Sequence, residues 1–202
     1  MSGRLSVIGL GPGDPAAMTA EAVCALKSPQ ALYGYAAYLD RLPPQSGQQR
    51  FASGNGEEAT RAAAALAHAA AGADIALVCG GDPGVFAMAA AVCEQIDAGP
   101  AAWRALEVRI VPGITAMLAV AARVGAPLGH DFCAISLSDN LKPWSVVERR
   151  LDAAAGAGFV LALYNPISRA RHRAASQPRP PRGRRTNKSP PDRQARPCRF
   201  RS

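Results

Sequence analysis

The sequence predicts an α/β fold, in which helices cover a mostly parallel sheet. Short apolar runs alternate with helical patterns over residues 1–171, and this alternation is typical of such sheets. Glycine and proline gather where several of the apolar runs end. The composition, 49% hydrophobic and 19% charged among 202 residues, is that of a soluble globular protein with enough apolar material for one or two domains.

The expected strands and helices follow one another in regular order. Short apolar runs predict strands over 5–9, 75–79, 108–111, 132–135 and 159–163. Helical patterns predict helices over 20–26, 57–71, 85–95, 116–124 and 143–155. Thr19 and Thr115 stand where N-cap residues are expected, and Glu21 lies in a first turn, where a carboxylate favours the helix dipole.

The positive charge of the chain is concentrated at its end. Residues 1–171 carry 13 Lys and Arg against 14 Asp and Glu, a net charge of −1, whereas residues 172–202 carry 10 against 1, a net charge of +9. The basic pI therefore does not mark the expected globular part as a nucleic-acid-binding protein. We expect segment 172–202, rich in Arg and Pro, to be disordered because it cannot bury enough apolar surface to offset its chain entropy.

The five cysteines do not form a pattern of metal ligands or disulfides. They stand at positions 24, 79, 93, 133 and 198, with no C-x-x-C pair, and no histidine lies at ligand spacing from them, so we expect no bound metal. The scattered set favours a reducing cytosol. We also expect a cytoplasmic protein without a membrane partner, because the sequence shows neither a signal peptide nor an apolar run of about 20 residues.

The glycine-rich segment 9–15, Gly-Leu-Gly-Pro-Gly-Asp-Pro, follows the first expected strand. Its glycines let the backbone approach a ligand closely, although a tight turn without a ligand explains them equally well. Pro12 and the delayed helix distinguish the segment from the dinucleotide-binding fingerprint. Asp14 is a candidate for orienting a substrate or exchanging a proton, and the alternative is a turn residue.

Two further segments repeat the strand-to-loop-to-helix pattern. In 80–86, Gly-Gly-Asp-Pro-Gly-Val-Phe, free backbone groups suit a polar small molecule, and Asp82 either accepts hydrogen bonds from the ligand or caps the helix expected near Val85. In 112–116, Pro-Gly-Ile-Thr-Ala, a ligand would meet the free amides of a helix N-terminus, where Thr115 is the expected cap. Ligands of parallel sheets gather at such loops.

Other candidate groups in the chain carry less information. Tyr33, Tyr35 and Tyr38 are expected to pack in the core, with a flat, hydrophobic ligand as the alternative. Ser136 and Ser138 lack the context of a nucleophile elbow, so a hydrolase triad is not expected.

In their order and spacing, the three glycine-rich segments resemble the tetrapyrrole methylase superfamily. Ser-Leu-Ser-Asp at 136–139 and Tyr-Asn-Pro-Ile-Ser-Arg at 164–169 narrow the resemblance to members that methylate carbon 17 of precorrin-3B, with ring contraction to precorrin-4, in cobalamin biosynthesis. The resemblance runs from about Arg4 to Arg171. It implies two α/β domains with a cleft between them, usually in a homodimer, with S-adenosylmethionine as the methyl donor. The acceptor is a tetrapyrrole, precorrin-3B or its cobalt form.

The resemblance also implies which residues contact the donor and the macrocycle. The implied donor contacts are Gly11, Pro12, Gly80, Gly81, Asp82, Val85, Thr115 and Ala116, together with Tyr164 and Asn165 from the second domain. The loop with Asp14, the catalytic candidate, is implied to face the cleft where the macrocycle enters. Because a sulfonium methyl group is already electrophilic, alignment of donor and acceptor rather than an enzyme nucleophile carries much of the chemistry.

Carboxylates of a tetrapyrrole substrate require cations on the protein. Arg123, Lys142 and Arg149 are candidates, and the alternative is that they are solvated surface charges.

The sequence departs from the superfamily after Arg171. We expect an N-terminal α/β methylase domain over 1–129, an incomplete second α/β domain over 130–171 and the disordered tail over 172–202. A truncated second domain or a shifted reading frame would impair methyl transfer. The alternatives are another methylase of the superfamily, or a non-enzymatic product whose basic tail binds polyanions. Specific nucleic-acid binding is not expected, because Phe200 is the only aromatic residue in the tail.

Overall fold

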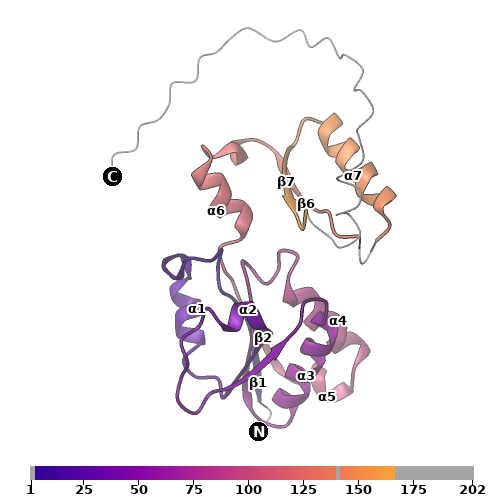
Figure 1. Cartoon of the computed structure of the whole chain (residues 1–202). Helices are drawn as coiled ribbons and strands as arrows, with labels where there is room; N and C mark the ends of the chain where they lie inside the picture. The colour runs from indigo at the N-terminus through magenta and orange to yellow at the C-terminus, as the bar shows by residue number, and fades with distance from the viewer. Residues whose placement is uncertain (1–2, 140–141, 167–202) are drawn as a thin grey trace, which may run out of the picture. The chain divides into compact units, whose positions relative to one another are not determined.

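The computed structural model describes residues 3–139 and 142–166, so the expected tail and the end of the expected second domain lie outside the described residues. These described residues belong to one compact unit. The elements, drawn in Figure 1, are β1 Arg4–Gly9, η1 Pro15–Ala17, α1 Ala20–Ala25, β2 Ala31–Tyr35, α2 Ala36–Leu39, β3 Gln49–Ser53, α3 Glu58–Ala70, β4 Asp74–Cys79, α4 Met88–Ala98, α5 Ala101–Arg104, β5 Glu107–Val111, α6 Ala116–Arg123, η2 Pro127–Gly129, β6 Phe132–Ser136, α7 Trp144–Gly156 and β7 Val160–Tyr164.

The larger sheet has five strands in the order β3-β2-β4-β1-β5. All its strand pairs are parallel, and at its centre Val7 of β1 lies between Leu77 of β4 and Ile110 of β5. The carboxyl ends of the strands therefore meet at one edge, which is where ligands of such sheets bind. The predicted α/β fold with a mostly parallel sheet is confirmed.

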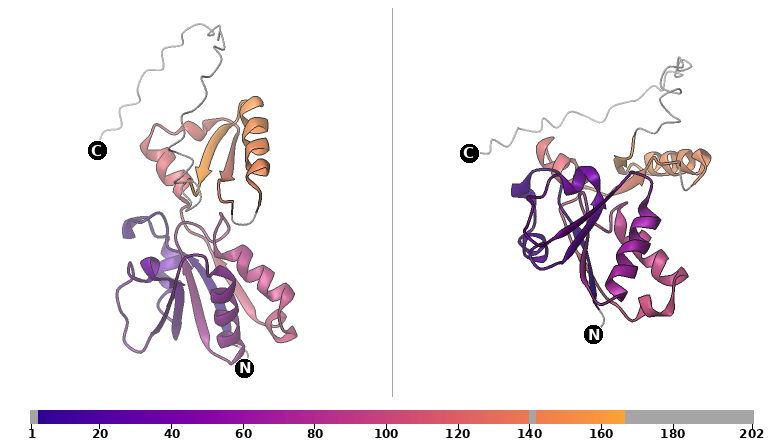
Figure 2. Two further views of the ribbon diagram at one scale, coloured as in Figure 1. Left: turned by 45° about the vertical axis from the view of Figure 1, so that its right-hand side comes forward. Right: turned by 60° about the horizontal axis from the view of Figure 1, so that its bottom comes forward.

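Helices cover both faces of the larger sheet. Successive side chains of a strand point to opposite faces, so a single strand contributes to the core on each side. Leu5 and Val7 are buried against α3, α4 and α5, in a core that also contains Leu66. Ile8 lies in the opposite core, with residues of α1 and α2 such as Ala22. Figure 2 shows these two groups of helices on opposite sides of the sheet.

Strands β2 and β3 are not predicted from the sequence. Gly34 interrupts the apolar run of β2, and it is needed there because a Cβ atom would lie only 2.7 Å from Cγ2 of Val78 on the neighbouring strand. β3 carries polar and charged residues such as Arg50 within its five positions. In both strands, pairing with a neighbour overrides the local sequence.

A second, two-stranded parallel sheet pairs β6 with β7, with Ala134 opposite Ala162. Both strands and α7 confirm elements that the sequence predicts. This sheet begins at Phe132, just after residue 129, where the first domain is expected to end; the division into two domains stays a prediction. No helix within residues 3–139 and 142–166 has the length and apolar character that crossing a membrane requires.

Candidate functional site

Three loops meet at the carboxyl edge of the larger sheet, after β1, β4 and β5. Gly11 and Gly81 exchange two backbone hydrogen bonds, with N···O distances of 3.1 and 2.9 Å. Both glycines have φ +68°, a left-handed conformation that residues with a Cβ atom rarely adopt. The first two glycine-rich loops are therefore paired directly.

Gly113 brings the third loop against the other two. A Cβ atom on Gly9 would lie 2.6 Å from the carbonyl oxygen of Gly81, and one on Gly113 would lie closer still to the same oxygen. Atoms cannot approach so closely without a backbone shift, so these positions require glycine. The glycines thus pack the loops against one another.

The Asp82 carboxylate joins the second loop to the third. Its Oδ1 accepts the amide of Gly84 at 2.8 Å and its Oδ2 accepts the amide of Gly113 at 3.1 Å. Each oxygen of an ionised carboxylate has two lone pairs, so Asp82 keeps acceptor capacity for a ligand. The sequence-based alternative, in which Asp82 caps a helix, is wrong because α4 begins only at Met88.

The expected helix start at Val85 is corrected by the backbone of the next residue. Phe86 has φ +52°, which is incompatible with a right-handed helix and unusual for a bulky residue. Its side chain is 50% exposed, and its ring centroid lies 5.0 Å from that of Tyr164. Such conformations cluster at functional sites, and the glycine-rich pattern of 80–86 does not reveal this one.

Tyr164 brings the second sheet to the N-terminus of α6. Its hydroxyl group lies 2.5 Å from Oγ1 of Thr115 and accepts the amide of Met117 at 3.0 Å. Thr115 occupies the N-cap position, but its side chain makes no cap hydrogen bond. The expected capping interaction is therefore corrected: the tyrosine hydroxyl, from 47 residues further along the chain, satisfies the helix amide.

Several amides of the three loops form hydrogen bonds within the protein. The N–H groups of Gly11 and Gly81 bond to each other's carbonyls, and those of Gly84 and Gly113 bond to Asp82. The expectation of free backbone groups in 80–86 is therefore wrong for the amides of Gly81 and Gly84, whereas no hydrogen bond of the Asp82 amide is found among the described residues.

The space beside Gly81 remains open on the side of α6. A Cβ atom there would meet only Cα of Thr115 at 3.7 Å and the amide nitrogen of Ala116 at 3.9 Å, and no hydrogen bond of that amide is found among the described residues. An amino-acid group carrying both a carboxylate and an ammonium fits this chemistry. The Ala116 amide at the start of the helix would meet the anion, and the spare lone pairs of Asp82 would meet the cation.

Two other predicted site residues have local partners. Oδ1 of Asp14 accepts the amide of Ala16 at 2.9 Å, so Asp14 caps the short helix η1 and is exposed. Asn165 has φ +52°, and its Nδ2 donates to Oγ of Ser136 at 3.0 Å.

The structure brings Gly11, Gly81, Asp82, Thr115 and Tyr164 together through the contacts above. The ligand roles of all these residues stay predictions.

The segment that follows β2 lies against two of the loops, which sequence reasoning missed. A Cβ atom on Gly80 would lie 2.8 Å from Cε1 of Tyr38, so the phenol ring packs on the Gly80 backbone. Arg41 donates from Nη2 to the carbonyl oxygens of Leu10 at 3.0 Å and Gly11 at 3.4 Å. No pattern near Arg41 in the sequence indicates these contacts, which span about 30 residues.

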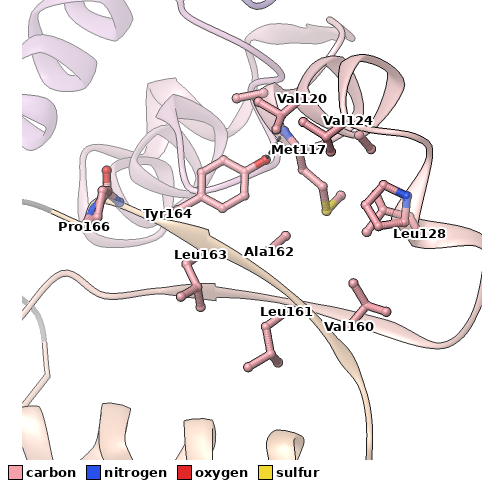
Figure 3. Close-up of a pocket in the computed structure, with 14 residues that line it drawn as sticks. Met117, Val120, Val124, Leu128, Val160, Leu161, Ala162, Leu163, Tyr164 and Pro166 are labelled. Atoms are coloured by element: carbon pink, nitrogen blue, oxygen red, sulfur yellow. Dashed lines mark hydrogen bonds between the residues drawn. The ribbon is translucent and has the colours of Figure 1, made fainter.

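An apolar hollow of about 400 Å³ lies between α6 and β7 (Figure 3). Met117, Val120 and Val124 line it from the helix, and Leu161 and Leu163 line it from the strand. It holds none of the cations proposed for substrate carboxylates. Arg123 and Arg149 are exposed on α6 and α7, and their role stays a prediction.

No three His, Cys, Asp or Glu side chains gather as a possible metal site in the described part of the chain. The described cysteines are free; Cys24 and Cys93 are exposed and Cys79 is buried.

Comparison with known proteins connects these loops to a family. The family described as Tetrapyrrole (Corrin/Porphyrin) Methylases matches residues 4–183. A precorrin-3B C(17)-methyltransferase of Sinorhizobium sp is 64% identical over 171 residues, which are 85% of this chain and 67% of that protein. The crystal structure of the methyltransferase CobJ superimposes with a TM-score of 0.81 at 49% identity, covering 84% of this chain and 71% of that one.

A more distant structure contains a ligand. The uroporphyrin-III C-methyl transferase of Thermus thermophilus, complexed with S-adenyl homocysteine, is 27% identical with a TM-score of 0.50, and the match covers 66% of this chain and 59% of that one. The family match spans the three interlocked loops and the Tyr164 strand. The chain belongs to the tetrapyrrole (corrin/porphyrin) methylase family.

Proposed function

We propose that this protein transfers a methyl group from S-adenosylmethionine to carbon 17 of precorrin-3B, with ring contraction to precorrin-4, in the biosynthesis of cobalamin. The observation that carries the proposal is the mutual packing of Gly9, Gly81 and Gly113, which makes three loops one rigid wall at the ligand-binding edge of the sheet. The similarity to a precorrin-3B C(17)-methyltransferase supports the choice of acceptor.

The donor would lie beside Gly81, between the second loop and the start of α6. Asp82 would accept hydrogen bonds from its ammonium group, and the Ala116 amide would bind its carboxylate. Thr115 and Tyr164, already bonded to each other, would close this wall. Gly80, Val85 and Asn165, with Gly11 and Pro12 of the first loop, complete the proposed set of donor contacts.

S-adenosylmethionine supplies a methyl group that is activated by its sulfonium, so the protein needs no nucleophile of its own. The task of the loops is to hold donor and acceptor in line and to exclude water. Alignment of this kind accounts for about 7–11 kcal/mol of a barrier in intramolecular reactions. The closely packed glycine-rich loops suit that task, because a rigid wall holds its ligands in one geometry.

Asp14 is the proposed proton-handling or orienting group on the macrocycle side. It lies in the loop after β1, which pairs with the donor loop through Gly11. Oδ1 holds the Ala16 amide, which fixes the orientation of the carboxylate while Oδ2 is left for a substrate. This role fits an exposed residue at the edge of the site.

The proposal also includes an oligomeric state and a cellular compartment. We expect a homodimer in the cytoplasm, acting on precorrin-3B or its cobalt form, and no metal bound by the protein itself.

A methyl-transfer assay tests the proposal. The purified 202-residue protein is incubated anaerobically with methyl-labelled S-adenosylmethionine and precorrin-3B, and the products are analysed by mass spectrometry. Label in a tetrapyrrole of the mass of precorrin-4 supports the proposal. Label on a different carbon, located by NMR, would favour another methylase of the family. Absence of label when a full-length relative is active would contradict the proposed activity of this chain.

A further inference from the structure

Arg41 is a half-buried cation for which no ion pair with a carboxylate is found in the described part of the chain. The ion pairs found there join Arg4 to Asp74 and Arg109 to Glu21. Nη2 of Arg41 instead donates to the backbone carbonyls of loop 9–13. Backbone carbonyls are neutral, so the charge of this guanidinium is not balanced by the groups that hold it.

The rest of the guanidinium is available to a ligand. Arg41 carries five N–H donors, and the only acceptors found for them among the described residues are the carbonyls at Nη2. The only fully buried side-chain atom without a partner in that part of the chain is Oε1 of Gln48. The unused N–H groups on Nε and Nη1 of Arg41 are therefore in contact with solvent.

Arg41 differs in this respect from the two other arginines of this half of the sheet. Both terminal nitrogens of Arg50 donate to carbonyls at 2.6–3.1 Å, from Leu39 at the end of α2 and from Leu42 and Pro43 beyond it, so Arg50 fixes the end of that helix. Arg61 is 6% exposed and donates to groups around Ser53 and Gly54. Arg41 combines solvent-facing donors with direct hydrogen bonds to the loop that pairs with Gly81.

We propose that Arg41 forms an anion-binding subsite beside loop 9–13 and binds a carboxylate group of the tetrapyrrole acceptor. The inference rests on the proposed function, because that function supplies a substrate with several carboxylate side chains. Arginine suits the role, since its planar N–H groups match a carboxylate and it stays charged at all physiological pH values. The hydrogen bonds to Leu10 and Gly11 would orient the guanidinium before the substrate arrives.

A subsite predicts effects that differ from those of a structural brace. Arg41→Gln keeps an NH2 donor group for the loop carbonyls but removes the charge, and Arg41→Lys keeps the charge but loses the planar donor set. Arg50→Gln is the matched control, because it removes an arginine that also binds backbone carbonyls of this region without facing the site.

The test uses the full chain and uroporphyrin III, a stable octacarboxylate macrocycle, as the probe. Its binding is followed by fluorescence at two salt concentrations, with S-adenosylhomocysteine binding and thermal unfolding measured in parallel. We expect Arg41→Gln to weaken uroporphyrin binding about tenfold, as the loss of a charged hydrogen bond does, and to make the affinity less dependent on salt. Arg41→Lys should weaken it less, and neither variant should change S-adenosylhomocysteine binding.

Three results would overturn the subsite. The first is a wild-type protein that does not bind the probe, and the second is an Arg41→Gln variant with unchanged probe affinity. The third is an equal loss of thermal stability and of S-adenosylhomocysteine binding in Arg41→Gln and Arg50→Gln, which would make Arg41 a brace. Arg41-dependent probe binding in a protein that does not methylate precorrin-3B would support the subsite and refute the proposed function. Methylation of precorrin-3B that is unchanged by Arg41→Gln would support the proposed function and refute the subsite.

Discussion

Gly11 and Gly81 adopt the same left-handed conformation and exchange two backbone hydrogen bonds across the ends of β1 and β4. The pairing commits the amides of both residues to the protein itself. A ligand at this edge therefore depends on groups that remain open, such as the Asp82 carboxylate and the Ala116 amide, and not on the amides of Gly11 and Gly81.

Gly81→Ala should destabilise the protein, because an L side chain at φ +68° costs about 1–2 kcal/mol. It should also weaken binding of S-adenosylhomocysteine, since the new methyl group would point toward Thr115 and Ala116. Gly129→Ala is the control, because a Cβ atom at that position meets nothing within 4 Å. Urea unfolding gives the stability of each variant, and equal values for the two would contradict the predicted strain.

Gly113→Ala should destabilise through a clash rather than through backbone strain. Its Cβ atom would meet the carbonyl oxygen of Gly81 at less than 3 Å, and overpacking of this kind costs about 1–3 kcal/mol. We expect the third loop to move away from the second, which is measured as changed amide chemical shifts in both loops. Unchanged shifts at Gly81 and Gly84 would show that the loops are not interlocked.

Asp82→Asn should loosen the junction of the second and third loops even without a ligand. An amide side chain has one oxygen acceptor, so either Gly84 or Gly113 would lose its bond, at a cost of about 1–3 kcal/mol. The exposed Asp97, for which no side-chain bond is found among the described residues, gives the control Asp97→Asn. In the absence of ligand, the amide signals of Gly84 and Gly113 should change in Asp82→Asn and stay unchanged in Asp97→Asn. A variant with unchanged spectra but lost ligand binding would instead make Asp82 a ligand contact alone.

Tyr164→Phe should expose the first turn of α6. The hydroxyl group accepts the Met117 amide and bonds to Thr115, and each hydrogen bond contributes about 0.5–1.5 kcal/mol. Hydrogen exchange at the Met117 amide should accelerate. Tyr35→Phe is the matched control, because no hydrogen bond of that hydroxyl is found among the described residues. Equal exchange rates in the two variants would remove the proposed link between β7 and α6.

The thiols should differ in reactivity and in their effect on stability at high pH. Burial raises the pKa of Cys79 to about 11, whereas a cysteine in the unfolded chain has a pKa of about 8.5. Because the folded-state pKa is the higher one, the contribution of Cys79 to stability is complete below about pH 8. It is lost as the pH rises toward 11.

At pH 8, a thiol reagent should therefore modify Cys24 and Cys93 well before Cys79. Cys79→Ala should reduce the loss of unfolding free energy at alkaline pH. Fast labelling of Cys79 in the native protein would contradict its burial.

The sequence predicts those parts of the fold that local patterns encode. The apolar runs of β1 and β4 and the glycines that follow them place two loops at one edge, and the structure confirms their meeting at Gly11 and Gly81. β2 is missed because its Gly34 makes sense only beside Val78, whose position depends on strand order. Thr115 is assigned the wrong bond because its partner, Tyr164, is 49 residues away.

The sequence likewise predicts only part of the candidate site. Glycine-rich loops after strands identify most of its backbone, since that pattern has a local physical cause. The internal bonds of Asp82 and the contacts of Arg41 with Leu10 and Gly11 depend on packing between distant segments, so no local pattern encodes them.

The most direct test of the account is a titration of the ¹⁵N-labelled protein with S-adenosylhomocysteine, followed by amide chemical shifts. We expect saturable shifts at Gly81, Gly84, Gly113 and Ala116 that are reduced in Gly81→Ala and retained in Gly129→Ala. Shifts confined to the apolar hollow between α6 and β7, or none at the three loops, would contradict it.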